Sequence, residues 1–182
     1  GAEVPVSLLY RKGFQPNGKA PLLIEAYGSY GYSSDPYFDS DVLSLVDRGF
    51  VYAIAHIRGG ADKGWGWYLD GKREKKTNSF DDFAASARAL IEAKYTRAKR
   101  IVGHGGSAGG MLMGAVANRA GELFAGIVAE VPFVDVLNTM LDDTLPLTPP
   151  EWPEWGNPIE SENDFRTILS YSPYDNLVAK DY

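Results

Sequence analysis

The stretch around Ser107 has the residue types and spacing of a nucleophilic serine. Gly105-Gly106-Ser107-Ala108-Gly109 fits the pattern G-x-S-x-G of a nucleophile elbow, a sharp turn between a strand and a helix. The residues two positions before and after such a serine are forced together, so both must lack side chains. Free N–H groups at the start of the following helix can stabilise negative charge that develops beside the serine. An ordinary glycine-rich turn would give the same pattern, so the choice between the two interpretations depends on the rest of the sequence.

A serine nucleophile needs a base to take its proton and an acid to orient that base. The chain has two histidines, His56 and His104, and both precede Ser107. In hydrolases with this elbow the chain order is serine, acid, histidine. We therefore expect both histidines to be packed residues that hydrogen-bond to the backbone. Asp135 stands after a strand, where some hydrolases keep their acid, but no histidine follows it. The base and acid are expected beyond Tyr182.

The elements that must position Ser107 alternate between strands and helices. Apolar runs predict strands over 4–12, 21–27, 50–57, 100–104 and 124–131. Helical spacing predicts helices over 40–48, 79–95, 108–120 and 160–169, with one turn over 137–141. Ser79 and Asp82 resemble a capping box, residues 72–76 are interpreted as a solvated connection, and residues 144–158 as a loop. This alternation predicts a mainly parallel sheet covered on both faces, with functional groups at its C-terminal edge.

Composition limits the function classes. A chain of 182 residues with 45% hydrophobic and 23% charged residues is typical of one globular domain. Cysteine is absent, which excludes thiolate catalysis and disulfides, and no apolar run is long enough for a membrane span. The first residues show no signal-peptide pattern, so we expect a cytoplasmic protein, with a periplasmic one as the alternative. From Asp135 onward ten acidic residues face two basic ones, which disfavours nucleic acid and favours either a cationic ligand or a solvated acidic face.

Together these motifs resemble the catalytic domain of the prolyl oligopeptidase family of serine peptidases (S9), and within it the oligopeptidase B branch. The likeness covers nearly the whole chain in order, through residues 27–31, 47–54, 56–60, 105–112, 131–136, 154–158 and 170–176. It implies an α/β-hydrolase fold in which residues 1–182 form one partial domain. The C-terminal strands and the family's N-terminal β-propeller are expected elsewhere in the same protein. It also implies hydrolysis of short peptides through an acyl-enzyme, without cofactor or metal.

The resemblance implies roles for individual residues. Ser107 matches the nucleophile. The Tyr27 hydroxyl and the Ala108 backbone N–H match the oxyanion hole, where a phenol can donate to a developing oxyanion. Tyr30 matches an aromatic wall of the substrate site.

The same branch cleaves after Arg or Lys with the help of acidic pockets, because a carboxylate forms charge-assisted bonds with these side chains. Glu151 matches one pocket glutamate, and Asp35 matches an acidic residue of a neighbouring subsite. The sequence departs from the family pattern at two positions. Pro153 stands where the pocket of Glu151 should have a second glutamate, and Tyr37 stands where the subsite of Asp35 should have a second acid. Glu154 is a candidate replacement for the missing pocket glutamate. Short peptides with basic residues are therefore the expected substrates.

Two alternatives stay open. An esterase or lipase would share the fold, but the loop 27–31 differs from the His-Gly-Gly-Gly oxyanion loop common in those enzymes. A dinucleotide-binding module would use Gly103, Gly105 and Ala108, with Glu130 about twenty residues further on. Glycines around a serine generate that second pattern automatically, and it leaves Tyr27 and the acidic segment unexplained.

Overall fold

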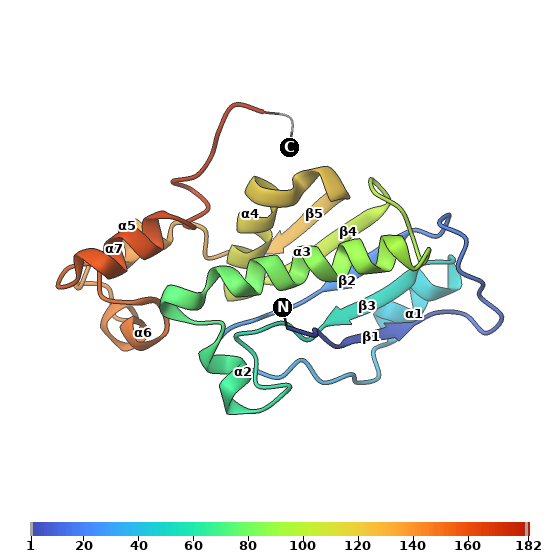
Figure 1. The fold of residues 1–182 in the computed structure, drawn as a ribbon, viewed down its shortest axis with the longest axis horizontal. Helices are drawn as coiled ribbons and strands as arrows, with labels where there is room; N and C mark the ends of the chain where they lie inside the picture. The colour runs from blue at the N-terminus through green and yellow to red at the C-terminus, as the bar shows by residue number, and fades with distance from the viewer. Residues whose placement is uncertain (1, 181) are drawn as a thin grey trace.

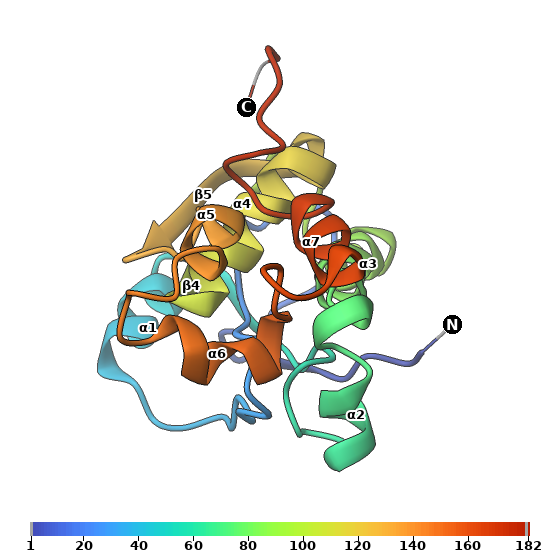
Figure 2. The ribbon, with the colours of Figure 1, turned by 90° about the vertical axis from the view of Figure 1, so that its left-hand side faces the viewer.

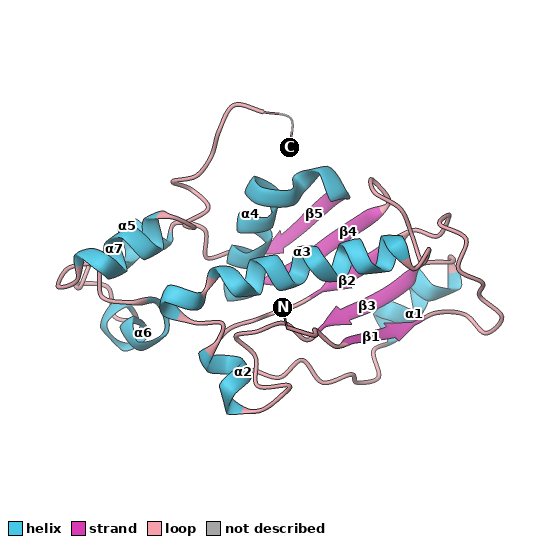
Figure 3. Ribbon diagram, viewed as in Figure 1, coloured by secondary structure: helices cyan, strands magenta, loops and turns pink. Residues whose placement is uncertain are grey.

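The structure is a computed structural model that describes residues 2–180 and 182, and a single five-stranded sheet organises that part of the chain (Figure 3). The strand order is β1-β3-β2-β4-β5. The strands are β1 (Val6–Leu9), β2 (Leu22–Glu25), β3 (Val51–Ala55), β4 (Ile101–Gly106) and β5 (Phe124–Glu130). Strands β2 to β5 run parallel, and β1 pairs antiparallel with β3. The predicted mainly parallel sheet is therefore confirmed.

Helices cover both faces of the sheet, as predicted. They are α1 (Ser40–Asp47), α2 (Trp65–Leu69), α3 (Thr77–Glu92), α4 (Ala108–Ala120), α5 (Val136–Met140), α6 (Thr148–Trp155) and α7 (Glu162–Leu169), with short 3₁₀ turns at Arg73–Lys75 and Gly121–Leu123. Figure 2 shows α3 and α4 on one face and α1 on the other. In Figure 1, α2, α5, α6 and α7 gather beyond the C-terminal ends of the parallel strands. The site predicted at that edge therefore has helical walls.

The core lies between the sheet and the helices α3 and α4. Leu22, Ile24, Val51 and Ala53 contribute almost no surface to solvent, which fits parallel strands buried on both faces. From the helices, Phe80, Phe83, Met111 and Leu112 pack against these strands. In the described part of the chain no helix is long and apolar enough to cross a bilayer.

Two local predictions were wrong. Helix α3 begins at Thr77, so Ser79 and Asp82 lie inside it, and both side chains bond to Arg58 instead of forming a capping box. The connection 72–76 is not fully solvated, because Lys76 is only 1% exposed. In both cases the side chains bond to residues that are distant in the sequence, and such partners cannot be inferred from the spacing of apolar residues.

Two further helices lie where the sequence analysis predicted no helix. Residues 148–155 form helix α6, which has proline in its first turn, where N–H groups have no partner inside a helix. Residues 65–69 form the short helix α2, whose Trp67 donates its ring N–H to the His56 carbonyl oxygen at 3.0 Å.

Candidate active site

Ser107 stands between β4 and α4 in a strained conformation. Its φ is 55° and its ψ is −116°, a backbone region that non-glycine residues rarely adopt. Its N–H donates to the Glu130 carbonyl oxygen at 2.9 Å, and its carbonyl oxygen accepts from the N–H groups of Met111 and Phe133, each at 3.1 Å. These bonds tie the turn to β5 and α4, while the Ser107 residue itself is exposed. The geometry is that of a nucleophile elbow.

The glycines around Ser107 are required sterically. A Cβ atom on Gly105 would lie 2.3 Å from the Gly109 carbonyl oxygen, which confirms the expected crowding across the turn. Gly109 must lack a side chain for a second reason. A Cβ atom on Gly109 would lie 2.9 Å from the carbonyl oxygen of Ala26, just after β2. Close approach of β2 and α4 therefore brings Tyr27 next to the elbow.

Tyr27 follows β2 and faces the serine. Burial raises the pKa of its hydroxyl, and a hydrogen bond with the Ser107 side chain partly opposes this rise. The phenol therefore stays protonated at neutral pH and keeps a proton to donate. Ala108, the first residue of α4, presents a backbone N–H that has no partner inside the helix. The structure thus brings together Ser107, Tyr27 and Ala108.

A cavity of about 420 Å³ opens beside the serine. Its lining is mostly apolar and contains one carboxylate, that of Glu151. The lining residues are Tyr30, Ser107, Ala108, Phe133, Thr139, Met140, Leu145, Pro146, Leu147, Thr148 and Glu151. Of the residues expected to bind substrate, Tyr30 and Glu151 therefore lie in one cavity with the serine.

Two aromatic side chains hold the Glu151 carboxylate. Its Oε2 accepts a hydrogen bond from the Tyr30 hydroxyl at 2.7 Å and from the Trp155 ring N–H at 2.9 Å. Burial and the nearby Glu151 raise the pKa of Tyr30, so its hydroxyl remains a donor. Glu151 is partly exposed, which leaves carboxylate surface free toward the cavity. The arrangement fixes a negative charge in an otherwise apolar space.

Glu154 lies behind Tyr30. It is 4% exposed, its Oε1 accepts from the Tyr30 backbone N–H at 3.0 Å, and its Oε2 accepts from the Tyr68 hydroxyl at 2.7 Å. Lys72 lies 4.0 Å from the same carboxylate. Donors of the chain thus already bond both Glu154 oxygens. The neighbouring Pro153 is exposed.

Asp35 lies in a different cavity, of about 170 Å³. This second cavity is also lined by Tyr27, Tyr37, Glu25 and His104. Because its lining also includes Gly105 and Gly106, the two residues before Ser107, the second cavity adjoins the elbow. The Asp35 side chain is exposed at this place.

The two histidines bond to side chains rather than to the backbone, so that part of the expectation was wrong. His104 Nδ1 lies 3.2 Å from Glu25 Oε2, and its Nε2 lies 3.3 Å from Glu130 Oε1. Hydrogen bonds to these carboxylates, foremost Glu25, raise the pKa of His104. Both ring nitrogens are thereby occupied by groups other than Ser107.

His56 belongs to a serine–histidine–aspartate cluster that does not include Ser107. Its Nε2 lies 2.8 Å from the Ser7 hydroxyl, and its Nδ1 lies 3.0 Å from Asp62 Oδ1. Ser7 stands in the middle of β1, with neither a sharp turn nor a helix N-terminus beside it. This cluster supplies a matched control serine for experiments on Ser107.

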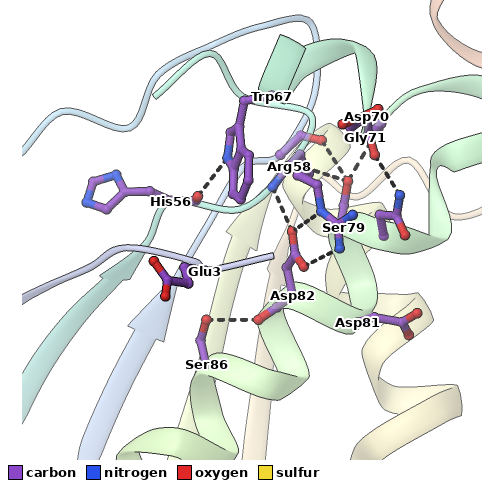
Figure 4. Close-up of polar contacts among 12 residues, drawn as sticks. Glu3, His56, Arg58, Trp67, Asp70, Gly71, Ser79, Asp81, Asp82 and Ser86 are labelled. Atoms are coloured by element: carbon purple, nitrogen blue, oxygen red, sulfur yellow. Dashed lines mark hydrogen bonds and ion pairs between the residues drawn. The ribbon is translucent and has the colours of Figure 1, made fainter. Parts of the chain in front are cut away.

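Sequence reasoning missed the residues that hold the loop after β3. Figure 4 shows Arg58 clamped by Asp82 of α3, with its Nε 2.8 Å from Oδ2 and its Nη2 2.6 Å from Oδ1. The Ser79 hydroxyl donates to the Arg58 carbonyl oxygen at 2.6 Å. This clamp places Gly59 so close to Gly28 that a Cβ on Gly59 would lie 2.0 Å from the Gly28 carbonyl oxygen. The Arg58 clamp therefore buttresses the loop that carries Tyr27.

Residues 36–181, well over half of the chain, match the prolyl oligopeptidase family. The chain belongs to the prolyl oligopeptidase family. It is 53% identical over all 182 residues to Protease 2 of Moraxella lacunata, and 54% identical over 180 residues to dipeptidyl aminopeptidase BI of Pseudoxanthomonas mexicana. It covers 26% and 25% of the length of these relatives, or about a quarter.

Solved structures of the prolyl oligopeptidase family share the fold. Oligopeptidase B from Leishmania major superposes with a TM-score of 0.96 and 46% identity, over 100% of this chain and 25% of that one. Oligopeptidase B from Trypanosoma brucei with covalently bound antipain, in a closed form, superposes with a TM-score of 0.97 and 46% identity. This match covers 100% of this chain and 26% of that one. The expected family, its oligopeptidase B branch and the α/β-hydrolase fold class are confirmed. The described residues form the sheet domain and contain no β-propeller.

Proposed function

We propose that this chain supplies the nucleophile and the oxyanion hole of a serine peptidase that cleaves short peptides through an acyl-enzyme. The observation that carries the proposal is the strained Ser107 elbow, which places an exposed serine beside Tyr27 and a cavity of about 420 Å³. The triad aspartate and histidine come from other parts of the parent protein, because both histidines of this chain are bonded elsewhere. We expect the isolated chain to be inactive.

The geometry supports a defined sequence of steps. The Ser107 hydroxyl loses its proton to the parent's histidine and attacks the peptide carbonyl carbon. The negative carbonyl oxygen then accepts from the Tyr27 hydroxyl and the Ala108 N–H, which stabilise it more than the neutral ground state. Collapse expels the amine, protonated by the same histidine, and leaves an ester on Ser107. Water activated by that histidine hydrolyses the ester and frees the enzyme.

Active-site labelling tests the nucleophile. A fluorophosphonate probe applied to the parent protein should label Ser107, identified by peptide mass spectrometry, and Ser107→Ala should abolish both labelling and peptide hydrolysis. Ser7→Ala is the matched control, since Ser7 also lies beside a histidine and an aspartate. We expect this control to leave labelling and activity unchanged. Labelling that persists in Ser107→Ala would overturn the assignment.

A preference for Arg or Lys before the cleaved bond is part of the proposal. Glu151 is the one carboxylate in the cavity lining, and a guanidinium or ammonium entering there would form charge-assisted bonds with it. Glu154 adds negative charge from behind Tyr30 rather than by direct contact. Asp35 takes a second basic side chain in the neighbouring cavity. Pro153 and Tyr37 leave each pocket with one direct carboxylate, so the preference is weaker than two acids would give.

Substrate comparison tests this preference. In the parent, Glu151→Gln should lower kcat/KM for Arg substrates by about tenfold to a hundredfold, the value of one charged hydrogen bond, and leave Leu substrates nearly unchanged. Glu160→Gln, an exposed glutamate outside the cavity lining, is the control. Equal rates for Arg and Leu substrates in the wild type would refute the carboxylate pocket.

The alternatives predict different results. An esterase would hydrolyse acyl esters with no measurable turnover of peptide amides. A dinucleotide-binding module would bind NAD tightly without labelling at Ser107. The cytoplasmic location stays a prediction, with the periplasm as the alternative, and fractionation of cells that produce the parent distinguishes the two.

A further inference from the structure

Lys76 is a buried amine at the start of α3, outside the residues expected to act on substrate. Its residue is 1% exposed, and its Nζ donates to the Gly28 carbonyl oxygen at 2.6 Å and to the Ser29 hydroxyl at 2.8 Å. The ring of Trp155 lies 5.1 Å from the same nitrogen. Among the described residues no carboxylate lies within 4 Å of Nζ, so an ion pair does not explain the burial.

The two acceptors of Lys76 are the residues between Tyr27 and Tyr30. Gly28 has a φ of 70°, and a Cβ there would lie 2.5 Å from Ile57, so the backbone has little freedom to relax. Ser29 is fully buried. This dipeptide follows Tyr27 directly, so holding it in place restrains the backbone on the C-terminal side of Tyr27. Lys76 is the side chain that bonds to both residues from inside the protein.

The cost of burying Lys76 argues that its bonds matter. Burial lowers the pKa of the Lys76 amine to about 7, and the negative charge of Glu154 partly opposes this. A neutral amine still has two N–H groups, which match the Gly28 carbonyl and the Ser29 hydroxyl. Lys76 can therefore donate both hydrogen bonds whether its amine is charged or neutral. Removal of the amine would leave a buried carbonyl without this donor.

We propose that Lys76 is a positioning residue of the oxyanion hole, which holds Gly28 and Ser29 so that the Tyr27 hydroxyl points at Ser107. The proposal rests on the proposed function, since it assigns Lys76 to the same reaction. Lys76 acts through Tyr27 and touches neither substrate nor the reacting atoms. Its loss should thus affect the transition state, in which Tyr27 donates to the oxyanion, more than substrate binding.

A kinetic comparison in the parent protein tests this role. Lys76→Met should lower kcat by about tenfold to a hundredfold, as expected for a misplaced catalytic donor, and change KM less than about twofold. Rates are expressed per active site titrated with the fluorophosphonate, so that partial unfolding does not count as lost catalysis. Lys75→Met is the matched control, because Lys75 is exposed and pairs with Asp70 on the surface. It should leave kcat unchanged.

A double-mutant cycle separates positioning from general stabilisation. Tyr27→Phe alone should lower kcat by about a hundredfold or more, the effect of one oxyanion-hole donor. Adding Lys76→Met should then lower kcat less than about twofold further, because Tyr27 has no hydroxyl left to misplace. The proposal would be overturned if the kcat losses of Tyr27→Phe and Lys76→Met multiplied in the double mutant. It would also be overturned if Lys76→Met left kcat unchanged. If Lys76→Met fails to fold, Ser29→Ala is measured in the same cycle, and the same two outcomes decide.

Failure of the proposed function gives a different result. If Tyr27→Phe keeps the wild-type kcat while Ser107→Ala is inactive, Tyr27 is not an oxyanion donor, and both assignments fall. If Ser107→Ala keeps activity, the nucleophile is wrong whatever Lys76 does. If Tyr27→Phe is impaired and Lys76→Met is not, only the role of Lys76 is rejected.

Discussion

At the scale of single residues, the reactive geometry depends on missing side chains. Ser107 holds a positive φ, and Gly105 lets β4 turn into α4 without collision. The strain is tolerated because hydrogen bonds to Glu130, Met111 and Phe133 hold the turn in place. Chemistry at the elbow is therefore sensitive to a single added methyl group.

Two neighbouring glycines make this sensitivity testable. Gly105→Ala would place a Cβ 2.3 Å from the Gly109 carbonyl oxygen, whereas Gly106→Ala would meet its nearest atom at 3.8 Å. We expect Gly105→Ala to lower the stability of the parent by about 1–3 kcal/mol, a typical cost of overpacking, and to abolish fluorophosphonate labelling. Gly106→Ala should keep labelling. Thermal unfolding and labelling of both variants check this, and equal labelling would contradict the steric argument.

At the scale of elements, His104 of β4 links the strands on either side of it. Its ring bonds to Glu25 of β2 and Glu130 of β5, three residues before Ser107 in the chain. The carbonyl oxygen of Glu130 also accepts from the Ser107 N–H. The edge of the sheet that carries Ser107 is therefore held by a histidine between two carboxylates.

This link predicts a pH-dependent stability. Because the pKa of His104 is raised in the folded protein, its contribution is fully present below the unfolded value of about 6.5 and is lost as pH rises through the folded value. His104→Asn should thus lower the melting temperature of the parent more at pH 6 than at pH 9. Glu130→Gln should act in the same direction with a smaller effect. An equal loss at both pH values would contradict the link.

At the scale of the whole molecule, the sheet orders the chemistry along one edge. The parallel strands β2, β3 and β4 end in the loops that carry Tyr27, Arg58 and Ser107, and the helices α5 to α7 lie beyond the same end of these strands (Figure 1). The acidic segment from Asp135 onward forms these helices, so its carboxylates divide between the cavity, as with Glu151, and buried anchors, as with Glu154. A charge count alone does not separate the two.

The sequence by itself was enough for the local features. The glycines of the elbow, the apolar strands and the amphipathic helix α3 follow from sterics and periodicity over a few residues, and they led to the correct fold class. The family was reached through the resemblance of motifs along nearly the whole chain. Tertiary structure decided the partners: Lys76 with Gly28, Glu154 with Tyr30, and His104 with Glu25 are 48, 124 and 79 positions apart. Whether a charged residue is solvated or buried depends on such distant groups. For that reason a lysine in an ordinary charged run became an anchor of the loop that carries Tyr27.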